Sequence, residues 1–130
     1  MEKIDIHIHT RLPKYSGEGR FKSTGSTETM DYLNKQQIVH GIIMSMGETE
    51  LPNNAECAEI CQEEKNLHWN CNFDAKDPKN IFKRMEACKK LGAVGVGELF
   101  INEKIDSPII QAIFVAAEQL ELLQFRYCFI

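Results

Sequence analysis

Apolar residues recur along this chain with two alternating periods, every second residue in some stretches and every third or fourth in others. Segment 3–9 (KIDIHIH) alternates isoleucine with polar residues, as in a strand with one aliphatic face. Segment 38–46 (IVHGIIMSM) is almost continuously apolar, which is typical of a strand covered on both faces. Further strands are predicted at residues 67–73, 93–99 and from 122 onward.

Helix-period segments separate these strands, and several have recognisable ends. Asn53 or Asn54 is expected to cap a helix that runs to about residue 65. The pairs Asp77-Pro78 and Ser107-Pro108 are typical helix starts, because the polar side chain caps free amides and proline tolerates the first turn. Gly92 is expected to end the helix after Pro78. Another short helix is predicted at 28–37.

Strands and helices thus alternate along residues 1–130, which indicates an α/β fold with a parallel sheet and right-handed crossovers. Two architectures satisfy this order, an open doubly wound sheet and the first part of an eight-stranded barrel. One domain is expected. Residues 11–27 are rich in Gly, Ser, Thr and Lys without periodicity, which predicts a long loop after the first strand.

Composition narrows the class of protein. The chain is 43% hydrophobic and 26% charged, as in ordinary globular domains, and no apolar run approaches the ~20 residues that span a bilayer. The net charge of −4 and the scattered lysines argue against a nucleic-acid partner. Five irregularly spaced cysteines favour reduced thiols, with Cys57 and Cys61 as packing residues. We expect a cytoplasmic protein without membrane contact.

Two histidines at the end of the first strand are the sharpest chemical feature. His7 and His9 are two residues apart and therefore project from one face of the strand. Imidazole nitrogens are common zinc ligands, and a strand holds such a pair in place for a catalytic site with open positions. A polar strand face in solvent is the alternative. His40 and His68 are predicted to be packing or surface residues, since they lie on apolar strands.

Glu98 follows small residues in the segment GVGEL, at the carboxyl end of the fourth strand. The carboxyl ends of parallel strands open on one rim, where active sites lie. His7, His9 and Glu98 are therefore expected to face one mouth and to bind a divalent metal, zinc first and manganese or iron otherwise. The alternative for Glu98 is a rim carboxylate paired with a lysine.

The IDIHIHT start, the GVGEL segment and the β/α rhythm resemble the amidohydrolase superfamily, particularly its amidohydrolase-related group. The resemblance implies the first half of a TIM-type (β/α)8 barrel, truncated in strand five. It implies that His7, His9 and, less directly, Glu98 bind the metal, and that activated water attacks an amide or ester of a small-molecule substrate. The family's ligands on strands five, six and eight have no counterpart in this sequence, so the fragment is expected to lack activity alone.

Three alternatives stay open. Some related enzymes are metal-dependent decarboxylases. Phosphoesterases of the polymerase-and-histidinol-phosphatase type also begin with an Asp-x-His-x-His-Thr strand. That family places a Thr-Asp-His-like element on the second strand, however, where GIIMSMGET has neither Asp nor His. A non-enzymatic α/β binding module with incidental histidines is the third alternative.

The last residues, 126–130 (RYCFI), differ from the aliphatic-Leu-Phe-His pattern of the family's fifth strand. If the codons for these residues are read one base earlier, they permit that pattern. We therefore expect a shifted reading frame to encode further strand-helix repeats. A deliberately chosen end of the expressed segment is the alternative. A half-barrel leaves two open sheet edges, which predicts self-association.

Overall fold

The computed structural model describes residues 1–15, 25–74, 78–99 and 103–124. It contains five strands: β1 (Lys3–Ile8), β2 (Ile38–Met44), β3 (Leu67–Cys71), β4 (Gly95–Val96) and β5 (Leu123–Gln124). It contains four α-helices and one short 3-10 helix: α1 (Ser26–Lys35), α2 (Asn54–Glu63), α3 (Ile81–Lys90), α4 (Pro108–Gln119) and η1 (Pro13–Tyr15).

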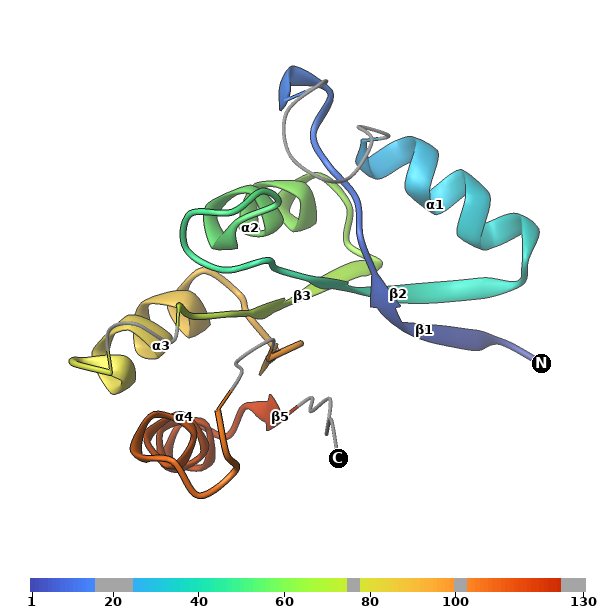
Figure 1. The fold of residues 1–130 in the computed structure, drawn as a ribbon. Helices are drawn as coiled ribbons and strands as arrows, with labels where there is room; N and C mark the ends of the chain where they lie inside the picture. Colours follow the sequence, from blue (N-terminus) through green and yellow to red (C-terminus); the bar gives the residue numbers. More distant parts are fainter. Residues whose placement is uncertain (16–24, 75–77, 100–102, 125–130) are drawn as a thin grey trace.

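The strands form one parallel sheet in the order β1-β2-β3-β4-β5. Each strand therefore lies beside the next one along the chain, which is the order of a barrel and not of a doubly wound sheet. In Figure 1 the sheet curls and the helices lie in an arc around its outer side. The predicted fold class, parallel β/α repeats forming the first half of a (β/α) barrel, is confirmed.

Side-chain alternation gives the sheet two different faces. The outer face carries the apolar residues that pack in one buried cluster with the helices, among them Ile43, Trp69 and Cys71. Residues between them along the strands, such as Ile42, His68 and Asn70, project to the opposite, concave face. Strand periodicity thus separates an apolar layer under the helices from a partly polar interior.

Several predicted boundaries were wrong by a few residues. The first helix spans Ser26–Lys35 and not 28–37. Gly25, with a positive φ of 78°, precedes its first residue, and the first turn includes Ser26 and Thr29, which are buried although they are polar. Most of the loop predicted at 11–27 lies outside the described residues; in its described part, Pro13–Tyr15 form η1 and Ser26 already belongs to α1.

Helix α3 begins at Ile81 after Asn80, not at the Asp77-Pro78 pair; Asp77 lies outside the described residues. Asn53 caps α2 as expected, its side chain accepting a hydrogen bond from the Glu56 amide at 3.0 Å. Ser107 precedes Pro108 at the start of α4, but its hydroxyl makes no capping hydrogen bond. The fourth strand is shorter than predicted, because Gly97 takes a φ of 115° and leaves the extended conformation directly after Val96.

Strand β1 lies at one edge of the sheet and keeps part of its outer face exposed. Ile4 and Ile6 are 61% and 54% exposed, although isoleucine usually lies inside. Self-association through the sheet edges stays a prediction. Among the described residues, no helix is both long and apolar enough to cross a bilayer.

Candidate metal centre

His7 and His9 meet at the carboxyl end of β1, as the two-residue spacing predicts. Ile8 between them packs against the buried cluster on the outer face, so both imidazoles project toward the concave face. Their Nε2 atoms lie 3.1 Å apart. The backbone amide of His7 also donates to Oδ1 of Asp5 at 3.0 Å, so the Asp5 side chain is held beside the His7 backbone.

Glu98 reaches the same point from the segment that follows β4, about ninety residues later in the chain. Its Oε2 lies 3.2 Å from Nε2 of His7 and 3.8 Å from Nε2 of His9, and its side chain is 6% exposed. Burial raises the pKa of the Glu98 carboxyl above its ordinary value, because an ionised carboxylate loses water there, while the nearby His7 opposes this rise. A positive charge at this point would therefore offset the cost of ionising a buried acid.

The three side chains suit a small divalent ion. All three ligand atoms lie within 4.8 Å of one another. Two ligand atoms bound to one tetrahedral zinc at ~2.0–2.1 Å lie about 3.3 Å apart. Nε2 of His7 lies at similar distances from its two partners, 3.1 Å from Nε2 of His9 and 3.2 Å from Oε2 of Glu98. Two imidazoles and one carboxylate leave a fourth position for water, which is typical of catalytic and not of structural zinc sites.

Asn72 holds the backbone beside this cluster. Its Nδ2 donates to the carbonyl oxygens of Glu98 at 2.7 Å and of Ser45 at 3.2 Å, so it joins the ends of β2, β3 and β4. Its Oδ1 accepts from the Phe73 amide at 2.8 Å. Asn54, the first residue of α2, fixes the Asn72 backbone with two hydrogen bonds of 2.9 Å. Asn72 is buried, so these contacts are shielded from water and orient the Glu98 segment.

A buried ion pair anchors the chain directly after His9. Nε of Arg11 donates to both carboxylate oxygens of Glu56, at 3.0 and 3.1 Å, and both side chains are almost completely buried. The Leu12 amide donates to the same carboxylate at 2.8 Å. The segment that leaves the first strand is therefore fixed against α2, which limits the freedom of the preceding histidines.

Sequence reasoning missed Asn72, Arg11 and Glu56. A polar residue directly at a strand's carboxyl end was the available signal for Asn72. Glu56 lies on a helix whose other inward residues are apolar, so only the tertiary contact with Arg11 explains its burial.

The prediction that Cys57 and Cys61 are packing residues agrees with their positions: Cys57 is buried in the core, and Cys61 is partly buried against it.

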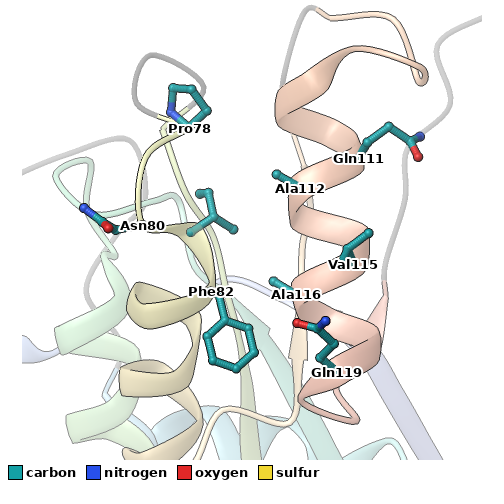
Figure 2. Close-up of a pocket in the computed structure, with 9 residues that line it drawn as sticks. Pro78, Asn80, Phe82, Gln111, Ala112, Val115, Ala116 and Gln119 are labelled. Atoms are coloured by element: carbon teal, nitrogen blue, oxygen red, sulfur yellow. The ribbon is translucent and has the colours of Figure 1, made fainter.

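A hollow of about 430 Å³ lies elsewhere, between α3 and α4 on the outside of the sheet (Figure 2). Figure 2 shows Phe82 on the α3 side facing Val115 and Ala116 of α4. None of the described residues that line it has an ionisable side chain. The described lining therefore offers no group for acid-base or metal chemistry, and the hollow is separate from the cluster of His7, His9 and Glu98.

The solved structures that are similar to this chain include the following two. A probable 2-pyrone-4,6-dicarboxylic acid hydrolase from Acinetobacter baumannii, solved with citric acid bound, aligns with a TM-score of 0.70 and 16% identity, over 98% of this chain and 50% of that one. An Agrobacterium tumefaciens protein in its apo form aligns with a TM-score of 0.66 and 18% identity, over 95% of this chain and 47% of that one. No protein-family model and no curated protein sequence matches the chain.

The chain spans about half the length of the structures it matches. Identities of 16% and 18% carry the likeness of fold and no further. Together with the consecutive strand order, the comparison identifies the described residues as the first half of a (β/α) barrel.

Proposed function

We propose that this chain carries part of the metal centre of a hydrolase of amidohydrolase type, with His7, His9 and Glu98 as ligands. The observation that carries the proposal is the convergence of the three ligand atoms within 4.8 Å, although Glu98 is far from the histidines in sequence. The A. baumannii protein of the same fold is named as a probable hydrolase, and on that ground we propose hydrolysis and keep decarboxylation as the alternative. The cluster takes no residue from β2, which disfavours the phosphoesterase alternative.

Each residue has a distinct part in this proposal. A divalent ion bound here would lower the pKa of its water and polarise a substrate carbonyl. His7 and His9 would hold the ion from the end of β1, and their fixed spacing limits the reorganisation that binding requires. The Glu98 carboxylate, from the segment after β4, would offset part of the ion's charge, and Asn72 orients the Glu98 backbone. Zinc fits this donor set first, with manganese or iron as alternatives.

The remaining ligands of such a centre, and the base that accepts a proton from water, have no counterpart among His7, His9 and Glu98. We therefore expect residues 1–130 to bind metal more weakly than a closed four-ligand site and to have at most trace hydrolytic activity. The substrate class of the A. baumannii protein is a dicarboxylic acid, which makes small carboxylated esters and lactones sensible first substrates for a longer form of the chain.

The test is a zinc titration in competition with a chromogenic chelator. We expect His7→Ala and His9→Ala each to weaken the tightest binding event at least tenfold, and Glu98→Gln to weaken it because the amide is a poorer ligand. Glu103→Gln, the same change at an exposed position, is the matched control and should bind as the wild type does. Equal zinc affinity in the wild type and the three ligand variants would overturn the assignment.

A further inference from the structure

A second pair of histidines lies on the concave face, near the opposite end of the sheet. His40 is the third residue of β2 and His68 is the second residue of β3, so both lie toward the amino ends of their strands. Their sequence neighbours Leu67 and Trp69 pack in the buried cluster on the outer face, so His68 projects away from the helices. The sequence alone favoured a packing or surface role for both histidines.

The distances within this pair are close to those of His7 and His9, although the ring planes are 30° apart here and 72° apart there. Nε2 of His68 lies 3.2 Å from Nδ1 of His40, and the ring centres are 5.3 Å apart. The corresponding values for His7 and His9 are 3.1 and 5.0 Å. Two imidazoles on one tetrahedral ion at ~2.0–2.1 Å have nitrogens about 3.3 Å apart and ring centres about 5.2 Å apart. In both pairs the separations of the nitrogens and of the ring centres are therefore close to those that one shared ion requires.

The protonation state also suits a cation. Partial burial, together with the neighbouring His40, lowers the pKa of His68 below its ordinary value. The neutral imidazole is the form that binds a metal, so little proton displacement is needed at neutral pH. The partial exposure of both side chains leaves room for water at the remaining coordination positions.

We propose that His40 and His68 form a second cation site, which binds a borderline divalent transition ion such as zinc, nickel or copper through Nδ1 of His40 and Nε2 of His68. Imidazole selects these ions over magnesium and calcium, which prefer oxygen ligands. Two protein ligands make the site weaker than the cluster of His7, His9 and Glu98. A simple N–H···N hydrogen bond between neutral imidazoles is the competing account of the same contact, and it predicts no ion binding.

The experiment uses the chain with His7→Ala and His9→Ala, so that the second pair is tested without the first. Nickel and zinc titrations of this variant should give one weak equivalent. Adding His40→Asn or His68→Asn should weaken that event at least tenfold, and a chain without any of its four histidines gives the baseline for adventitious binding. His40→Gln and His68→Gln keep more of the side-chain volume if the asparagine variants fold poorly.

A second measurement needs no change at the proposed ligands. Copper bound to the His7→Ala/His9→Ala chain should show electron paramagnetic hyperfine coupling to two imidazole nitrogens. Absence of both the weak equivalent and the coupling, or equal binding in the histidine-free chain, would overturn the second site. Either result leaves the first site untouched, because that one is judged by the tight event lost in His7→Ala and His9→Ala.

Discussion

Replacing Asn72 by alanine should weaken metal binding through the backbone of Glu98, without removing a ligand. The side chain donates to the Glu98 and Ser45 carbonyls and accepts from the Phe73 amide. Each hydrogen bond contributes ~0.5–1.5 kcal/mol net, and the groups left behind are largely shielded from water, so we expect a loss of about 2–4 kcal/mol in the free energy of unfolding.

The loss of metal affinity follows from the position of those contacts. The shortest of the three, 2.7 Å, goes to the carbonyl of the residue that supplies the carboxylate. Removing a group that orients a metal ligand typically costs about 10–100-fold in metal affinity, or about 1.4–2.7 kcal/mol. Urea unfolding without metal measures the loss in the free energy of unfolding. Zinc competition, carried out at urea concentrations well below the unfolding midpoint, measures the loss of metal affinity.

Ile113→Ala is the control for stability. Ile113 is fully buried on α4, outside the metal cluster, and the change should cost about 2–5 kcal/mol of stability without altering zinc affinity. If Asn72→Ala loses stability but binds zinc like the wild type, the positioning argument is refuted. If Ile113→Ala loses affinity equally, the effect reflects global stability and the role of Asn72 is again refuted.

Three further outcomes follow from the structure. Arg11→Met should lower the free energy of unfolding by about 3–5 kcal/mol because it leaves the buried Glu56 carboxylate without its guanidinium, and the double variant with Glu56→Met should recover part of that loss in urea unfolding. Gly95→Ala should cost about 1–3 kcal/mol or more, because an added Cβ would lie 2.7 Å from the Leu123 carbonyl oxygen; unchanged thermal unfolding would contradict this close approach. Burial raises the pKa of the Cys61 thiol to about 12, so alkylation of Cys61 at pH 8, followed by peptide mass spectrometry, should be on the order of 1000-fold slower in the folded than in the unfolded chain. The contribution of the buried neutral Cys61 thiol to the free energy of unfolding should be present below pH 9 and decline as the pH rises toward 12.

The sequence by itself determined the order of elements and the faces of the first strand. Alternation in segment 3–9 places His7 and His9 on one side because side-chain direction in a strand depends only on the local backbone. The same local information narrowed the cap of α2 to Asn53 or Asn54, of which Asn53 is the cap, and placed Glu98 near the carboxyl end of the fourth strand. Rules for parallel β/α repeats then placed both strand ends on one rim, which the 3.2 Å contact between His7 and Glu98 bears out.

Only the tertiary structure decided what surrounds these residues. The choice between a barrel and a doubly wound sheet depends on which strands become neighbours, and neither order leaves a local signature. The contacts of Asn72 with Glu98 and of Arg11 with Glu56 join residues 26 and 45 positions apart. The His40–His68 pair likewise arises from the register between β2 and β3. Periodicity reports which face a side chain occupies, whereas its partners across the sheet are set by strand register and packing.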